Sequence, residues 1–167
     1  MSITEFTILV GLGSFAAGFL GALTGLGTLA LVISLLFSLY AHFQRREVLV
    51  VTLDARAGAP PSGVTMLENH GRLHMADRLE RTFEEWERWS SEVLDSHLAY
   101  PILAYFRSSH DNESWISALG AVLDAATLVV TTIEGVSKGQ ALMMVELGIH
   151  LVEDLASGFN LPEETEV

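Results

Sequence analysis

The fold is decided by residues 6–43, which read FTILVGLGSFAAGFLGALTGLGTLALVISLLFSLYAHF and contain no Asp, Glu, Lys or Arg. The run is 38 residues long, whereas a helix needs about 20 apolar residues to cross a hydrocarbon core of about 30 Å. Its densest part, Leu26–Tyr40, is interrupted only by one glycine and three hydroxyl residues. We therefore predict one long transmembrane helix over residues 6–44, tilted or hinged because it exceeds an upright span.

The first half of this stretch is rich in glycine, which lets two membrane helices approach closely. Gly21 and Gly25 share a helix face with Ala17 at a spacing of four residues, and Gly27 follows. We interpret Gly21, Gly25 and Gly27 as helix-packing positions, with a hinge as the alternative. A hairpin that folds near Gly25–Gly27 is the second possible arrangement, although two spans of that length would be marginal.

The charges that flank the stretch predict its orientation. Glu5 precedes it, while Arg45 and Arg46 follow directly after it. Because positively charged flanks stay on the cytoplasmic side, we expect the N-terminus outside the cell (inner) membrane and the remainder in the cytoplasm. No basic residue precedes the apolar run, so it does not resemble a cleavable signal peptide.

The composition of the rest of the chain excludes several classes of protein. The 167 residues are 50% hydrophobic and only 18% charged, and the net charge of −12 falls entirely on residues 48–167. An acidic segment repels phosphates, so a nucleic-acid partner is excluded. Without cysteine there is no disulfide, thiolate nucleophile or Cys-ligated zinc. No catalytic residue, cofactor loop or metal motif emerges, and we expect neither an enzyme nor a cofactor.

After the apolar stretch we predict a linker over residues 45–63, a helical bundle over 64–158 and an acidic tail over 159–167. Within the linker, the β-branched segment Val48–Arg56 predicts a short strand or an extended connector. The fold class is all-α: a long transmembrane helix followed by a cytoplasmic antiparallel bundle.

Three further helices are predicted within the bundle, and two of them have a predicted core face. The helix over Met75–Leu98 carries a seam at spacings of three and four. That seam consists of Leu79, Phe83, Trp86, Ser90, Val93 and His97. The last helix, over Gln140–Ser157, is expected to bury Leu142, Val145, Ile149 and Val152.

The helix over Ser114–Glu134 could belong to the bundle or to the membrane. Its only charge within residues 116–133 is Asp124, and a carboxylate at the centre of a bilayer helix costs roughly 2.5–3.5 kcal/mol. We favour a buried bundle helix and keep a second membrane span over 116–133 as the alternative.

Four polar residues of the bundle form a candidate network. His97 and Tyr100 continue an apolar seam, Asp124 is expected to lie buried opposite, and Arg107 is close in sequence. Since buried polar groups need partners, we expect some of the four to hydrogen-bond one another, in a structural role rather than as a ligand site.

Two histidines have a spacing that could suit a metal. His70 and His74 lie four residues apart, but no Glu stands between them and Gly71 weakens the helix. We interpret these two histidines as exposed and unrelated, and we expect no metal site.

Three blocks of the sequence resemble bacterial two-transmembrane potassium-channel-like proteins. Residues 24–47 (TGLGTLALVISLLFSLYAHFQRRE) are similar to the inner, pore-lining helix, and residues 53–61 (LDARAGAPP) to the linker that follows it. Residues 96–115 (SHLAYPILAYFRSSHDNESW) resemble a block of the attached cytoplasmic helical domain. The resemblance covers roughly residues 24–155.

The chain departs from that family where ions are selected. Such channels have an outer helix and a filter resembling T-x-G-Y-G, whose carbonyl groups replace the ion's water. Here only Leu9–Gly13 is faintly similar, without the threonine or the tyrosine. The resemblance implies a truncated or divergent channel subunit that forms homo- or hetero-oligomers with channel-type subunits and does not conduct alone. The alternative is a single-pass, membrane-anchored helical binding module without an ion path.

Overall fold

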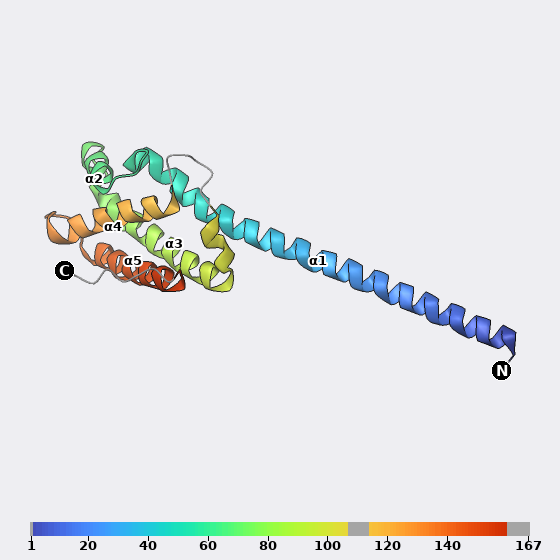
Figure 1. Cartoon of the computed structure of the whole chain (residues 1–167). Coiled ribbons are helices and arrows are strands. Elements are labelled where there is room, and N and C mark those ends of the chain that lie inside the picture. The colour runs from blue at the N-terminus through green and yellow to red at the C-terminus, as the bar shows by residue number, and fades with distance from the viewer. Residues whose placement is uncertain (1, 107–113, 160–167) are drawn as a thin grey trace. The chain divides into compact units, whose positions relative to one another are not determined.

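The computed structural model describes residues 2–106 and 114–159. Every regular element in these ranges is a helix and none is a strand, so the all-α prediction is confirmed (Figure 1). In chain order the elements are α1 (Ile3–Ala57), α2 (Gly63–Arg72), η1 (Ala76–Arg78), α3 (Leu79–Ala99), η2 (Pro101–Tyr105), α4 (Trp115–Thr131) and α5 (Gly139–Gly158). The two η elements are short 3₁₀ helices. The predicted acidic tail, apart from Phe159, lies outside the described residues.

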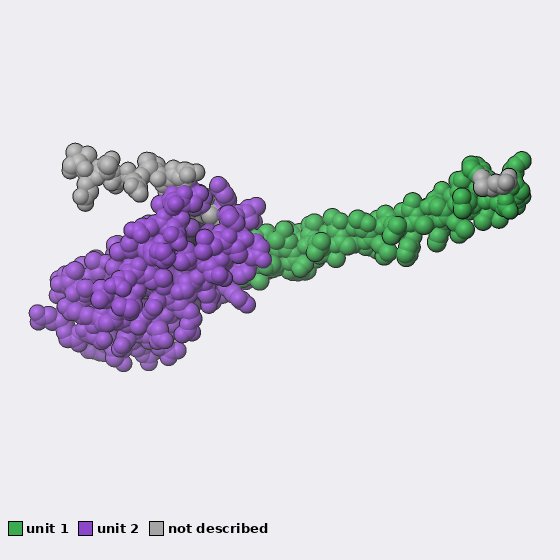
Figure 2. Space-filling model, turned by 90° about the horizontal axis from the view of Figure 1, so that it is seen from below, with its two compact units in different colours: residues 1–41 green, residues 42–167 purple. Residues whose placement is uncertain are grey.

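The chain divides into two compact units, Met1–Ala41 and His42–Val167, which Figure 2 colours separately. In the first unit every described side chain up to Phe37 is exposed. Within the described residues α1 is the one helix long and apolar enough to cross a membrane. It is continuous through Gly25–Gly27, which confirms the long helix and contradicts the hairpin.

The predicted strand at Val48–Arg56 is wrong, because these residues form the C-terminal part of α1. Val50, Leu53 and Ala57 are almost fully buried, and their spacings of three and four place them on one helix face. Burial of that face outweighs the β-branched composition, since intrinsic propensity is a weak preference. The linker is accordingly much shorter than 45–63. It begins at Gly58, whose φ of 81° is suited to ending a helix.

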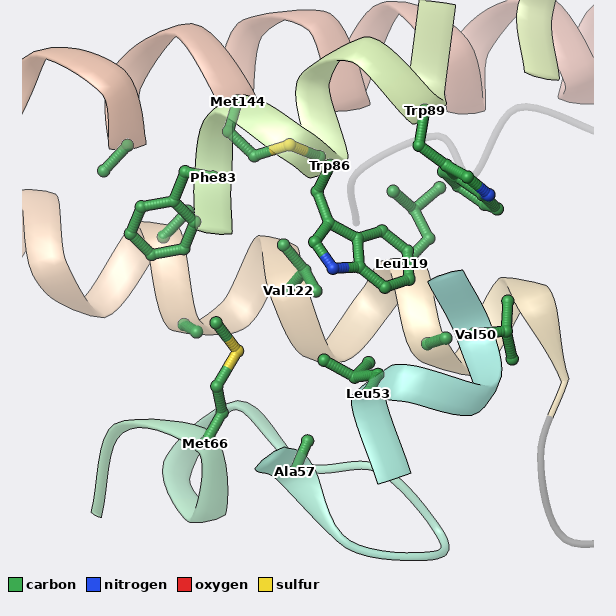
Figure 3. Packing of buried hydrophobic residues seen from close by; sticks show 14 of the residues in the cluster. Val50, Leu53, Ala57, Met66, Phe83, Trp86, Trp89, Leu119, Val122 and Met144 are labelled. Atoms are coloured by element: carbon green, nitrogen blue, oxygen red, sulfur yellow. The ribbon is translucent and has the colours of Figure 1, made fainter. Parts of the chain in front are cut away.

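The predicted seam of α3 is confirmed. All six of its residues are buried: Leu79, Phe83, Trp86, Ser90, Val93 and His97. Figure 3 shows Phe83 and Trp86 beside Val122 of α4 and Met144 of α5, with Leu53 of α1 nearby. The charged residues of α3 occupy the other side, where Arg81 and Arg88 pair with glutamates four residues away.

Helix α4 is a bundle helix that buries eight of its seventeen residues against its neighbours. Ser114 caps its N-terminus in a capping box with Ser117. Its contact with α2 depends on Gly63, where an added Cβ would lie 2.7 Å from the Ala121 carbonyl oxygen and from the Ala125 nitrogen. Ser62 caps α2 as its position suggests, accepting a hydrogen bond from the Thr65 amide.

The predicted core face of α5 is wrong. Leu142, Ile149 and Val152 are between 42% and 50% exposed, and Val145 is half-buried. The face that packs is formed by Ala141, Met144, Gly148 and Leu151. Gly148 has no side chain to hold α5 away from Leu123 of α4, so the small residues determine which face packs.

Candidate functional site: the buried Arg46 and His97

The three glycines singled out in the apolar stretch lie on the exposed part of α1. An added Cβ at Gly21, Gly25 or Gly27 would meet no atom within 4 Å among the described residues. The helix is regular through all three. These positions therefore pack against nothing in the described chain, and their role as packing positions stays a prediction.

The four residues of the expected polar network do not all come together. His97 is buried in α3, and Tyr100 is half-buried at the end of that helix. Asp124, by contrast, is exposed, so its predicted burial is wrong. The buried positions of α4, which include Val122 and Ala126, lie on the opposite face from Asp124 because residues two apart diverge on a helix. Arg107 lies outside the described residues.

His97 is held by its own helix and by an aromatic neighbour. Its Nδ1 donates a hydrogen bond to the Val93 carbonyl oxygen at 2.7 Å, which leaves Nε2 without a partner among the described residues. The ring centroid lies 5.3 Å from that of Trp115. Burial lowers the pKa of His97, the Val93 carbonyl partly offsets this, and the positive charge of Arg46 lowers the pKa further. These surroundings therefore favour the neutral imidazole over the charged form.

The central residue of this region is Arg46, whose exposed fraction is only 5%. Its two terminal guanidinium nitrogens donate hydrogen bonds to main-chain carbonyl oxygens, at 3.1 Å for Leu103 and 2.8 Å for Phe106. These carbonyl groups belong to the last turn of η2 and to its C-cap residue, where a positive charge is favourable. Arg46 thus joins the last part of α1 to the segment that follows α3.

Aromatic rings and one carboxylate complete the surroundings of Arg46. Its guanidinium carbon lies 5.4 Å from the centroid of Phe43 and 5.1 Å from that of Trp115, within the range of cation–π attraction. Glu47 lies 3.6 Å from its Nε. Burial lowers the pKa of Arg46, while the nearby negative charge of Glu47 opposes that change. An arginine stays protonated here, so the site is a fixed positive charge.

This arrangement suits a structural role: Arg46 holds two segments of the chain together, and His97 makes the stability of the bundle depend on pH. Trp115 contacts both the Arg46 guanidinium and the His97 ring, so the two groups share one aromatic neighbour.

In the described part of the chain no three residues among His, Asp and Glu gather in a way that could hold a metal. His70 and His74 are separated, since His70 is buried in α2 and His74 is exposed beyond its end. The expectation that His70 is exposed is therefore wrong.

The burial of Arg46 was not predicted, because its position directly after the apolar run indicates only a flanking charge. A pattern that could have revealed it is the helical spacing 4-3-4 of Arg46, Val50, Leu53 and Ala57, all of which are buried. Comparison with protein-family models, with curated proteins and with solved structures found no significant match.

Proposed function

We propose that the chain is a membrane subunit in which α1 crosses a lipid bilayer once and the helical bundle acts as its cytoplasmic assembly or regulatory domain. The observation that carries this proposal is the charge-free run of 38 residues on a helix whose side chains are exposed up to Phe37. For example, Leu31 is 73% exposed and Phe37 is 71% exposed. Soluble monomers rarely expose apolar patches of more than a few hundred Å², so lipid is the solvent that suits this surface.

The length of the run defines how such a helix would lie. At 1.5 Å per residue it extends about 57 Å, nearly twice the hydrocarbon thickness of about 30 Å. Tilt within the usual range cannot absorb that difference. We place Thr24–Phe43 in the hydrocarbon, because the apolar residues are densest there, and the glycine-rich part before it beyond the hydrocarbon or against a second helix.

The resemblance to potassium-channel-like proteins supports a channel-type subunit. In this proposal Gly21 and Gly25 pack against the helix of another subunit, and a filter-bearing partner supplies ion selectivity. The chain alone does not conduct. Co-purification from its native membrane with a filter-bearing subunit tests this association. Selective potassium current from liposomes that contain only this chain would contradict it.

A binding module without an ion path is the second candidate, and the exposed face of α5 favours it. This face is an apolar stripe formed by Leu142, Ile149 and Val152. No other described element covers the stripe, and its side chains stay exposed. We assign this stripe to a second copy of the chain, since the single membrane anchor aligns copies in one plane. Light scattering of the purified chain in detergent tests this assignment: a dimer that Ile149→Glu converts to monomer supports it, and persistence of the dimer in that variant contradicts it.

A further inference from the structure

The second unit contains a polar hollow of about 420 Å³ that is separate from Arg46 and His97. It lies where the end of α1, the end of α2, η1 and the start of α3 meet. Its walls include Arg56, Arg78, Arg81 and His70. A hollow of this size falls in the range of small-molecule binding sites, roughly 300–1,000 Å³.

The concentration of positive charge in this hollow contrasts with the rest of the protein. Three of only nine Lys and Arg residues line it, in a chain whose net charge is −12. Glu85 is the one acidic residue in the wall, and Arg81 neutralises it through a contact of 3.1 Å. The remaining charge of the wall is positive, so the hollow attracts anions that the outer surface repels.

The three arginines of the hollow differ in how many of their N–H donors already have a partner. Arg56 is half-buried, and its Nη1 donates to the Thr82 hydroxyl at 3.0 Å. Arg81 keeps donors beyond the one that reaches Glu85. Arg78 is exposed, and no hydrogen bond or ion pair joins its guanidinium to another described side chain, so its whole fork is available to a ligand.

His70 forms a buried wall of the same hollow and is 3% exposed. Its Nδ1 donates to the Met66 carbonyl oxygen at 2.8 Å, and its Nε2 has no partner among the described residues. An unpaired nitrogen so deeply buried is costly unless something compensates for it. Because His70 lines the hollow, a polar ligand there would lie beside this ring.

We propose that this hollow binds a phosphate monoester, with Arg78 and Arg81 as the principal donors and Arg56 as a fixed positive charge at its rim. Guanidinium forks match the spacing of phosphate oxygens and bind them in pairs. A phosphate monoester also offers a P–OH group that can donate to the Nε2 of His70, whose Nδ1 already carries the proton donated to Met66. The source is either a soluble phosphate monoester or the phosphomonoester headgroup of a lipid, which share this chemistry. The proposal does not depend on the channel resemblance.

The test uses the full chain in nanodiscs and follows thermal unfolding by tryptophan fluorescence, because a ligand that binds only the folded state raises Tm. In one arm inorganic phosphate is titrated into nanodiscs of phosphatidylcholine at constant ionic strength. In the other arm phosphatidic acid is added to the same lipid. The variants are Arg78→Gln, the double variant Arg78→Gln/Arg81→Gln, and Arg88→Gln as the control. Arg88 is matched because it lies on α3, pairs with Glu84 and does not line the hollow.

We expect a saturable rise in Tm with one of the two probes, and the responding probe identifies the source. Arg78→Gln should weaken binding about tenfold, since hydrogen bonds to charged groups contribute most, and the double variant should abolish it. Arg88→Gln should bind as the unaltered chain does. Absence of saturable stabilisation by both probes overturns the proposal, as does an equal loss of binding in Arg88→Gln.

Discussion

The indole nitrogen of Trp89 donates a hydrogen bond to the main-chain carbonyl oxygen of Arg46 at 3.0 Å. The two residues are 43 positions apart in sequence, so this bond joins α3 to the last part of α1. The same arginine donates to the carbonyl groups of Leu103 and Phe106. Arg46 is therefore linked through its backbone to one element and through its side chain to another.

Replacement of the Trp89 indole tests the backbone link. Trp89→Phe removes the donor and part of the ring, and we expect a loss of about 1–3 kcal/mol in the free energy of unfolding. Trp86→Phe is the control, because Trp86 is also buried, lies with its ring centroid 4.8 Å from that of Trp89, and loses the same ring atoms. Denaturant unfolding in mild detergent measures both. If the two variants lose the same stability, the Trp89 bond contributes nothing.

The side-chain link is tested by exchanging one basic residue for another. Arg46→Lys keeps the charge but cannot reach the Leu103 and Phe106 carbonyls together, and we expect a loss of about 2 kcal/mol. The adjacent Arg45 is exposed, so Arg45→Lys should change stability by no more than about 0.5 kcal/mol. Equal stability of the two variants would show that the buried fork has no structural role.

His97 makes the stability of the bundle depend on pH. Burial lowers the pKa of His97 below its ordinary value of 6.5, so the unfolded chain binds a proton more readily than the folded chain does. The contribution of His97 is therefore complete above pH 6.5 and is lost as the pH falls below that value towards the lowered pKa. In His97→Asn, whose amide can still donate to Val93, unfolding measured between neutral and mildly acidic pH should show a shallower decline. An unchanged slope in this variant would refute the assignment.

Replacement of Gly63 and of Gly71 by alanine should have opposite effects on stability, although both residues lie in α2. A Cβ at Gly63 would collide with the backbone of α4, so Gly63→Ala should destabilise the bundle by about 1–3 kcal/mol or more. Gly71 has open space around it, and Gly71→Ala should stabilise by about 0.5–1 kcal/mol through helix propensity. Thermal unfolding of the two single variants checks the pair. Effects of the same sign would contradict the packing described for Gly63.

The buried face of a helix could be predicted from the sequence where charged and apolar residues alternate with the helical period. In α3 the contrast between Phe83 or Trp86 and the surrounding glutamates and arginines defines one buried face. In α5 apolar residues surround the helix, and periodicity could not show that Gly148 rather than Ile149 faces the core. Size, not hydrophobicity, decides that orientation.

The candidate site was harder to predict because its contacts are distant in sequence. The carbonyl groups that accept from Arg46 lie 57 and 60 residues further along the chain. A local pattern contains no record of such partners, so the burial of Arg46 was not predicted, and His70 was wrongly predicted to be exposed. The prediction that Asp124 is buried was wrong for a different reason. Its apolar neighbours suggested burial, but they occupy only one side of α4.

We propose that α1 crosses a bilayer once, with the bundle on the far side from the N-terminus. The chain contains no cysteine, so a single introduced thiol reports its own location without interference. Thr4→Cys and Ser91→Cys place thiols at exposed positions near the start of α1 and on α3. In intact cells a membrane-impermeant maleimide should label Thr4→Cys at once and Ser91→Cys only after permeabilisation. Equal labelling of both thiols before permeabilisation, or recovery of the chain in the soluble fraction without detergent, would contradict the account.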